Sequence, residues 1–430
     1  MGRPDTADGF FLQKAVDSPG LFYFVMEVVM RKNFTAIFCL VMASLIICLL
    51  HSAVYAKTIK VGAAINMTGP ASSWGQFHAK GQQDYFRYVN EVKGGVGGNR
   101  IEMILVDTGY KVPEAVAAAK RFAIQDQVDM MATWGAGEGL AVKPIIQQYR
   151  IPTINYSTSW ELLEPPVNYM YLPFGSYRMD SYAILEYIRA IHKGKDAPRV
   201  GLLTYNNAYG RSIHEPCSDY AKKINVNIVA IEEFPPKTVD LTTELLRLQR
   251  KGAEYIFMQM LPATIVTALK SADRVKYSPM FLGTWTSTDP DFFRLGKGLI
   301  RDRLRIQFPG GLPGDKSEGI KVMTELWSRY KTVSKFDASY WEGIVVGMIM
   351  ERAFIRANQK YKEINRETIN KAMESFKNED FGGIVPNITY APNDHGASFK
   401  ARIVKVGEDG SFTPLTNFFN PLKEKIRLLK

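Results

Sequence analysis

Cysteine and histidine are scarce in this sequence, and their scarcity excludes several kinds of site. The 430 residues contain three cysteines, of which Cys39 and Cys48 lie in an apolar segment near the N-terminus. Residues 57–430 therefore contain only Cys217 and cannot form an internal disulfide, so the stability of this part must come from its core. The histidines show no H-x-H or H-E-x-x-H spacing, which leaves a metal site without support.

The sequence also lacks the motif of a nucleophilic hydrolase and any cluster of positive charge. No G-x-S-x-G motif is present, and no nucleophile has a base at a recognisable spacing. The net charge is +11, from 54 Lys and Arg against 43 Asp and Glu. The basic residues are scattered over segments with helical spacing, whereas a nucleic-acid site would gather them beside aromatic residues. We therefore expect neither catalysis nor a nucleic-acid partner.

Long apolar runs are absent except for one near the N-terminus. Phe34 to Leu50 is almost wholly apolar, follows the cationic Met30-Arg31-Lys32 and precedes Ala53-Val54-Tyr55-Ala56, which offers small residues for cleavage. This pattern predicts a secretory signal cleaved near Ala56 and a periplasmic mature chain starting near Lys57. The alternative is an uncleaved anchor, because the run approaches the roughly 20 residues of a spanning helix. Met1 to Val29 fits neither pattern and indicates that Met30 is the true first residue.

After residue 57 the hydrophobic pattern alternates between strand and helix in two successive series. The first series predicts strands at Ile59–Ile65, Ile101–Asp107, Val128–Trp134 and Ile151–Ser157, with a helix over Gln76–Lys93 and another over Leu140–Tyr149. The second predicts strands at Arg199–Tyr205, Val226–Glu232, Glu254–Met260 and Met280–Gly283. Three long helices (Ser317–Tyr330, Ala338–Asn358 and Arg366–Phe376) and a C-terminal hairpin (Phe399–Val406 and Gly410–Thr413) follow. The alternation predicts an α/β protein with doubly wound parallel sheets.

The length of the chain indicates two lobes. Removing 56 residues from 430 leaves 374, which is too long for one compact core. Segments rich in proline and glycine at 165–168, 172–175 and 308–314 are candidate crossings between lobes. We assign residues 1–56 to the N-terminal extension and signal, residues 57–175 and 306–384 to lobe 1, and residues 176–305 and 385–430 to lobe 2.

Aromatic and small polar residues gather where the predicted strands end. In open α/β sheets ligands bind beyond the carboxyl ends of the strands. A helix start at Gly135-Ala136-Gly137 also offers free backbone N–H groups that can hold an anion; its spacing differs from that of a nucleotide-binding turn. The other residues at these ends are Trp134, Tyr156, Ser157, Ser159, Trp160, Met260 and Trp285, with Trp74 and Trp341 near helix starts. Together they predict an aromatic-lined cleft.

These features resemble a known family. Ile59-Lys60-Val61-Gly62 leads to Thr68-Gly69-Pro70, then Trp74-Gly75, the glycine-rich 94–98 and Tyr209-Gly210 after a strand. Over Thr58 to Thr413 the order is similar to that of solute-binding proteins of branched-chain amino-acid-type ABC transporters, which have the type I periplasmic binding fold. The resemblance implies two lobes joined by three crossings, a small-molecule ligand in the cleft, membrane permease subunits as partners, no cofactor and no catalysis.

The resemblance also implies roles for single residues. Trp74 matches an aromatic that covers the ligand, Ser157 and Ser159 match positions that hold a carboxylate and an ammonium, and Tyr209 matches an aromatic of the second lobe. Phe336 lies near another apolar position of the family's pocket.

Departures from the family's pattern point away from a standard amino acid. Trp285 stands where amino-acid binders carry an acid, Met260 where a tyrosine is common, and Gly135-Ala136 where a serine is usual. An unpaired ammonium in a closed cleft costs several kcal/mol, although Asp180 could pair with it from the second lobe. We therefore expect an apolar or aromatic, carboxylate-like ligand. A quaternary ammonium ligand, an ordinary branched-chain amino acid and a sensor module of the same fold remain alternatives.

Overall fold

The computed structural model describes residues 57–333, 336–397 and 399–429, together with residues 20, 23, 24, 26–28, 30, 31, 34, 38 and 42. Its contacts divide the chain into residues 1–57 and residues 58–430. The described residues before residue 57 are helical, and Arg31 pairs with Glu27 at 3.2 Å. Most of the apolar run and the predicted cleavage site at Ala53–Ala56 lie outside the described residues. No helix of the described part of the chain is long and apolar enough to cross a membrane.

The first sheet is wholly parallel, with strand order β2-β1-β3-β4-β5. Its inner strand β1 is buried at every position except Lys60, as expected for a parallel strand covered on both faces. The strands are β1 (Ile59–Ile65), β2 (Ile101–Asp107), β3 (Met130–Thr133), β4 (Thr153–Asn155) and β5 (Met170–Tyr171). The elements between and after them are α3 (Ser72–Glu91), α4 (Val112–Ile124), α5 (Ala136–Tyr149) and η1 (Trp160–Leu163). We call this sheet and the helices that pack on it lobe 1.

The second sheet has the order β12-β11-β10-β9-β8-β6-β7 and is parallel from β10 to β7, whereas β11 and β12 add an antiparallel edge. Its strands are β6 (Arg199–Tyr205), β7 (Asn227–Phe234), β8 (Tyr255–Gln259), β9 (Met280–Gly283), β10 (Leu304–Phe308), β11 (Arg402–Val406) and β12 (Phe412–Pro414). The helices are α6 (Tyr177–Ile191), α7 (Ala208–Arg211), α8 (His214–Lys223), α9 (Thr242–Arg250), α10 (Pro262–Arg274), η2 (Trp285–Ser287) and α11 (Pro290–Leu295). We call this part lobe 2.

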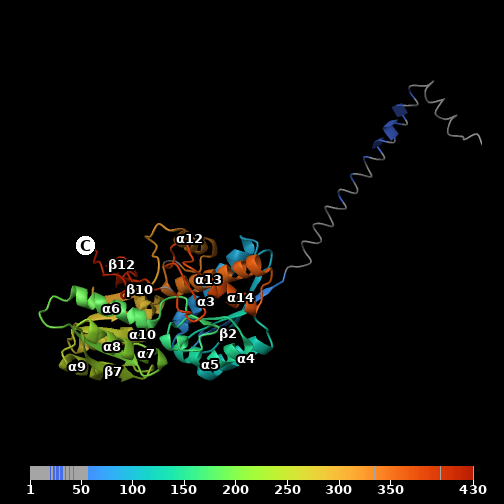
Figure 1. Cartoon of the computed structure of the whole chain (residues 1–430). Helices are drawn as coiled ribbons and strands as arrows, with labels where there is room; N and C mark the ends of the chain where they lie inside the picture. The colour runs from blue at the N-terminus through green and yellow to red at the C-terminus, as the bar shows by residue number, and fades with distance from the viewer. Residues whose placement is uncertain are drawn as a thin grey trace, which may run out of the picture. The chain divides into compact units, whose positions relative to one another are not determined.

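The chain passes between the two sheets three times. It leaves lobe 1 after β5, returns after β10 to form α12 (Glu318–Tyr330), α13 (Ala338–Tyr361) and α14 (Arg366–Glu374), and then enters the second sheet again as β11 and β12. Helix α13 packs along α3, so segments far apart in the sequence lie side by side in lobe 1 (Figure 1). This arrangement confirms the predicted α/β fold class.

Two glycines allow α3 and α13 to approach closely. A Cβ atom on Gly343 of α13 would lie 2.1 Å from the His78 carbonyl oxygen, and one on Gly81 of α3 would lie 2.2 Å from the Tyr340 carbonyl oxygen. Both distances are far shorter than a van der Waals contact. The crossing therefore needs a residue without a side chain on each helix.

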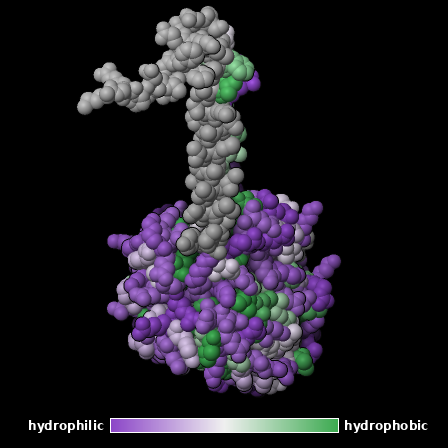
Figure 2. All heavy atoms as spheres, turned by 90° about the vertical axis from the view of Figure 1, so that its right-hand side faces the viewer, coloured by the Kyte–Doolittle hydropathy of each residue, from purple (hydrophilic) through white to green (hydrophobic). Residues whose placement is uncertain are grey.

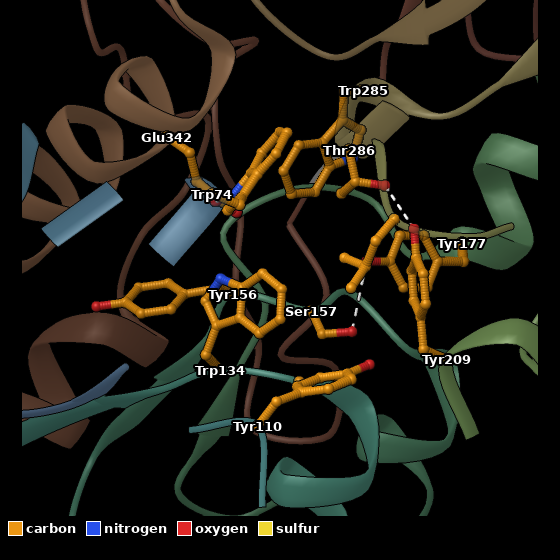
Figure 3. A pocket seen from close by; sticks show the side chains of 12 residues that line it. Trp74, Tyr110, Trp134, Tyr156, Ser157, Tyr177, Tyr209, Trp285, Thr286 and Glu342 are labelled. Carbon is orange, nitrogen blue, oxygen red and sulfur yellow. Dashed lines mark hydrogen bonds between the residues drawn. The ribbon is translucent and has the colours of Figure 1, made fainter. Parts of the chain in front are cut away.

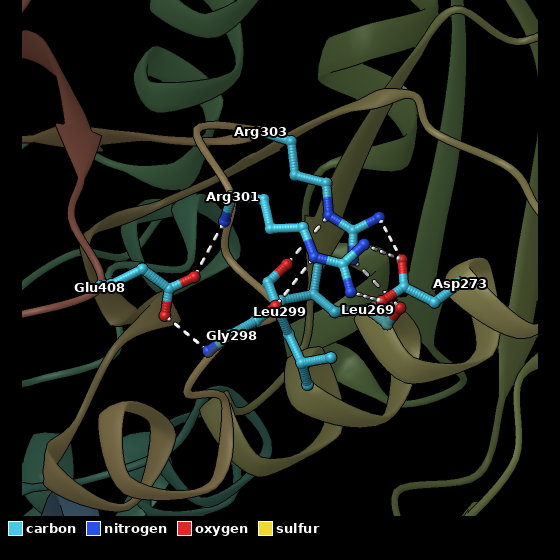
Figure 4. Close-up of polar contacts among 7 residues, drawn as sticks. All are labelled: Leu269, Asp273, Gly298, Leu299, Arg301, Arg303 and Glu408. Carbon is cyan, nitrogen blue, oxygen red and sulfur yellow. Dashed lines mark hydrogen bonds and ion pairs between the residues drawn. The ribbon is translucent and has the colours of Figure 1, made fainter.

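A cluster of charged side chains holds the segment that leads into β10 (Figure 4). The Glu408 carboxylate, from the turn between β11 and β12, accepts hydrogen bonds from the backbone N–H groups of Gly298, at 2.8 Å, and Arg301, at 3.0 Å. The Asp273 carboxylate at the end of α10 pairs with Arg301 at 2.9 Å and with Arg303 at 2.8 Å. These contacts tie the segment to its neighbours on both sides and so fix the start of β10.

Hydrophilic side chains dominate the surface. On the face of residues 58–429 seen in Figure 2, hydrophobic residues form only small, separate areas. Most apolar side chains lie instead in the core, where those of β1 and β6 are all buried, as are most of those of β8 and α13. The burial of these side chains accounts for stability without a disulfide.

Several elements differ from the sequence-based expectation. The helix predicted over Gln76–Lys93 begins four residues earlier, at Ser72, and the strands predicted over Val128–Trp134 and Ile151–Ser157 shorten to β3 and β4. The helix expected to run to Ile224 is divided into α7 and α8. Strand β10 and helix α6 were not predicted. The residues that were predicted as the carboxyl ends of these two strands form loops in the structure, and these loops carry the site.

Candidate functional site

A pocket lies between the two lobes, at the carboxyl ends of the parallel strands (Figure 3). Lobe 1 contributes residues that follow β2, β3 and β4, and lobe 2 contributes residues that follow β6, β8 and β9. The space not filled by atoms is about 350 Å³, but the centre of a water molecule can occupy only about 20 Å³ of it. The lining residues are Trp74, Tyr110, Trp134, Gly135, Tyr156, Ser157, Tyr177, Tyr209, Leu261, Trp285, Thr286 and Glu342.

Aromatic rings form most of the pocket wall. Trp74 of lobe 1 and Trp285 of lobe 2 lie 5.8 Å apart between ring centroids, with their planes tilted by 59°. Tyr110 and Trp134 form an edge-to-face pair at 5.7 Å. All four rings face the central space (Figure 3). A wall of this kind favours an apolar or aromatic ligand, because such a ligand gains from burial and from ring contacts.

Neutral polar groups line the part of the pocket that lobe 2 closes. The Ser157 hydroxyl donates to the Tyr177 hydroxyl oxygen at 3.4 Å, and the hydroxyls of Tyr209 and Thr286 are 2.7 Å apart (Figure 3). The buried indole N–H of Trp285 lies near the Asp180 carboxyl group, outside normal hydrogen-bond distance. The hydroxyl groups can donate to a carbonyl or carboxylate oxygen of a ligand. No Lys or Arg lines the described pocket.

One carboxylate, that of Glu342, lines the pocket from α13. Its Oε2 accepts a hydrogen bond from the Trp74 indole N–H at 2.9 Å and lies 2.9 Å from His78 Nδ1. Its Oε1 is buried and has no partner among the described residues. Burial raises the pKa of Glu342, and the bonds from His78 and Trp74 counteract this effect. The two α3 residues therefore hold the carboxylate in place while one oxygen remains available.

A second carboxylate occupies the helix start that the sequence indicated as an anion site. Gly135 has φ of 81° and precedes α5, and a Cβ atom there would lie 2.2 Å from Glu138 Oε2. Glu138 also accepts hydrogen bonds from Thr108 at 2.8 Å and from Asn66 at 3.3 Å. Burial raises the pKa of Glu138 to about 7. The protein's own carboxyl group therefore lies where a ligand anion was expected.

The match to known proteins covers most of the chain. The family model of periplasmic binding proteins matches residues 58–411. The chain belongs to the periplasmic binding protein family. This is a family of solute-binding proteins without enzymatic activity.

Solved structures and curated relatives agree with this assignment. This periplasmic binding protein is similar to a branched-chain amino acid ABC transporter protein from Thermus thermophilus with bound valine (25% identity, TM-score 0.76, 85% of this chain and 96% of that one). It shares its fold with a fatty acid ABC transporter substrate-binding protein from Thermomonospora curvata (22% identity, TM-score 0.78, 86% of this chain and 95% of that one). The Leu/Ile/Val-binding protein homolog 7 of Brucella suis is 22% identical over 260 residues, which span 58% of this chain and 65% of that protein.

The structure of this periplasmic binding protein brings together only part of the predicted site. The predicted residues that line the pocket are Trp74, Trp134, Gly135, Tyr156, Ser157, Tyr209 and Trp285. Those that do not line it are Ala136, Gly137, Ser159, Trp160, Asp180, Met260, Phe336 and Trp341. Ser159 donates to Glu161 at 2.7 Å, and Met260 is fully buried at the end of β8.

Three of the predicted aromatic side chains pack elsewhere. Trp341 stacks on Phe174 at 5.1 Å and belongs to the core between the lobes. Phe336 packs against Phe412 at 5.4 Å. The Trp160 indole N–H donates to the Ser212 carbonyl oxygen at 3.1 Å, outside the pocket.

Asp180, the predicted partner of a ligand ammonium, is fully buried in α6. Burial raises its pKa well above the ordinary value, and the Trp285 indole offsets this only in part. Asp180 therefore lies in the core of lobe 2 and does not line the pocket.

Five lining residues were not predicted: Tyr110, Tyr177, Leu261, Thr286 and Glu342. Tyr110, Leu261 and Thr286 lie within three residues of a strand end, so the rule that indicated Trp134 and Trp285 also applied to them. Tyr177 and Glu342 lie on helices, and nothing in their sequence neighbourhood shows that these helix faces meet the strand ends.

Proposed function

We propose that this periplasmic binding protein is the extracytoplasmic receptor of an ABC importer, which captures a small apolar or aromatic, carboxylate-like ligand and delivers it to permease subunits in the membrane. A signal cleaved near Ala56 would release the mature chain into the periplasm. The similarity to solved structures of ABC transporter proteins supports the transport role.

The observation that carries the ligand class is the composition of the pocket wall. Indole and phenol rings from both lobes enclose the space, whereas the polar groups at the lobe 2 side are neutral donors. Burying a ring-sized apolar group contributes a few kcal/mol at about 25 cal/mol per Å². The hydroxyls of Ser157, Tyr209 and Thr286 would then hold a carbonyl or carboxylate end.

A second candidate is a receptor for branched-chain amino acids. Glu342 favours it, because a carboxylate with a free oxygen can pair with an ammonium group. The Thermus thermophilus structure with bound valine also favours it.

Titration of the purified protein, followed by tryptophan fluorescence, distinguishes the two candidates. The probes are 3-phenylpropanoate, hexanoate, L-leucine and L-valine. We expect 3-phenylpropanoate or hexanoate to bind at least about tenfold more tightly than either amino acid, since an ammonium without adequate partners costs more than 1.4 kcal/mol. Tighter binding of L-leucine or L-valine would contradict the first candidate and support the second.

A further inference from the structure

Glu342 is the only acidic residue that lines the described pocket, and its contacts are asymmetric. Oε2 accepts a hydrogen bond from the indole N–H of Trp74 and contacts His78, both at 2.9 Å, while Oε1 has no hydrogen-bond partner among the described residues. A buried oxygen of a carboxylate without a hydrogen bond is costly. A group that fills the pocket and donates to Oε1 would remove this cost.

The position of Glu342 defines one end of the pocket. Figure 3 shows its carboxylate beside the Trp74 indole, on the opposite side of the space from the hydroxyls of Tyr209 and Thr286. The pocket therefore has an acceptor at its lobe 1 end and donors at its lobe 2 end. A ligand that matches both has an oxygen acceptor at one end and an X–H donor at the other.

We propose that Glu342 determines specificity by accepting, through Oε1, one hydrogen bond from a neutral hydroxyl or amide N–H group at the end of the ligand remote from its carboxylate. This rests on the proposed function and specifies the ligand class further. A neutral donor suits the site better than an ammonium group, because an ammonium brings three N–H groups and Oε1 is the single unpartnered carboxylate oxygen of the lining.

The buried Glu342 could instead serve only to join α3 to α13. In that case its removal would change stability, and the relative affinities of ligands with and without a donor would stay the same. The ratio of two dissociation constants therefore separates the two roles.

Three probes that share one skeleton test the proposal: 3-phenylpropanoate, 3-(4-hydroxyphenyl)propanoate and L-phenylalanine. In the wild-type protein we expect the phenol to bind about tenfold more tightly than 3-phenylpropanoate, as a hydrogen bond to a charged group provides, and L-phenylalanine to bind most weakly. In Glu342→Gln the amide oxygen accepts from Trp74 and the NH₂ group faces the ligand, where it can make only a weaker, uncharged hydrogen bond to the phenol oxygen, so the advantage of the phenol decreases severalfold. Glu342→Asp, which keeps the charge but shortens the reach, reduces the same advantage and serves if Glu342→Gln does not fold.

Glu351→Gln is the matched control. Glu351 is a buried acid of the same helix, paired with Lys93 at 2.9 Å and outside the pocket, so its substitution should leave the ratio of affinities unchanged. Equal binding of the phenol and 3-phenylpropanoate in the wild-type protein, or an advantage that is undiminished in Glu342→Gln, would overturn the proposal. So would tightest binding of L-phenylalanine, which supports the amino-acid receptor. Binding of none of the three would contradict the proposed function itself, and the role of Glu342 would fall with it.

Discussion

Three buried carboxyl groups, those of Glu138, Asp180 and Glu342, surround the pocket in different environments. Asp180 has only the Trp285 indole nearby, Glu138 accepts bonds from Thr108 and Asn66, and Glu342 accepts a bond from Trp74 and contacts His78. Burial raises the pKa of all three, because each loses hydration of its charged form. The bonds to Glu138 and Glu342 counteract this effect of burial and help to hold both groups in place.

The stability of the Glu138→Gln variant, compared with that of the wild type, should increase as pH rises. The folded-state pKa of Glu138, about 7, exceeds the ordinary 4.5. Between these values the unfolded state loses its proton first, so this group's contribution to stability falls as pH rises from about 4.5 to 7 and stays low above that. Glutamine resembles the protonated acid and lacks this penalty. We expect the free energy of unfolding of the variant, relative to wild type, to rise by about 2 kcal/mol between pH 5 and pH 8.

Urea denaturation at the two pH values measures this change. A constant difference between variant and wild type across the range would show that Glu138 is ionised in the folded protein as it is in the unfolded chain.

Among the site residues, the sequence predicted those whose position depends only on where a strand ends. Trp134, Tyr156, Ser157 and Trp285 follow strands directly, so their place at the sheet edge follows from the α/β fold. Glu342 was missed because its position depends on how far α13 is rotated and how closely it approaches α3. Its neighbour Trp341 points into the core instead, although both residues follow the same helix start.

Among the elements, the pair α3 and α13 positions the lobe 1 end of the pocket. Trp74 and His78 come from α3 and Glu342 comes from α13, so their hydrogen bonds join the two helices. The close crossing at Gly81 and Gly343 brings these side chains within reach of one another.

Gly343→Ala should destabilise the protein and weaken ligand binding. The new Cβ would lie 2.1 Å from the His78 carbonyl oxygen, so the helices must separate. We expect the free energy of unfolding, measured by chemical denaturation, to fall by about 1–3 kcal/mol, which is typical of overpacking. Gly137→Ala is the matched control, because in α5 the nearest atom to its Cβ would be 3.8 Å away. A helical alanine there should be neutral or stabilising by up to about 1 kcal/mol. Equal effects of the two substitutions would contradict a close crossing.

The elements that the sequence predicted well are those with strong, local periodicity. Strands β6 and β9 match their predicted bounds, and α12 differs by one residue. Strand β10 was not predicted, because the proline- and glycine-rich segment that follows it indicated a crossing between lobes and not the end of a strand. The break between α7 and α8 was missed because the apolar spacing continues across Ser212 and Ile213, so only the local backbone geometry separates the two helices.

The whole molecule has a closed form in which side chains of the two lobes touch. The Trp160 indole of lobe 1 donates to the Ser212 carbonyl oxygen of lobe 2, and the Arg178 guanidinium of lobe 2 lies 3.9 Å from the centre of the Trp160 ring. The pocket between the lobes is large enough for about one water molecule. A ligand of the proposed size can therefore enter only if the lobes separate.

Ligand should decrease the radius of gyration measured by small-angle X-ray scattering, because it binds the closed form better and shifts the population towards it. Trp160→Ala removes contacts made only in the closed form, so the free variant should have a larger radius than the free wild type. Trp327→Ala, in α12 and away from the other lobe, is the control and should match the wild type. An unchanged radius in Trp160→Ala and on addition of saturating 3-phenylpropanoate would contradict lobe closure.

Cys217 has a consequence for measuring this motion in single molecules. The thiol is fully buried in α8, and burial raises its pKa to about 12, so it offers almost no thiolate to an alkylating reagent. Cysteines introduced at Ile124 of lobe 1 and Val239 of lobe 2, whose side chains are 56% and 89% exposed, would react instead. The protein can thus carry a donor and an acceptor fluorophore through maleimide coupling while its native thiol stays in place, and energy transfer between the dyes would report each opening as it occurs.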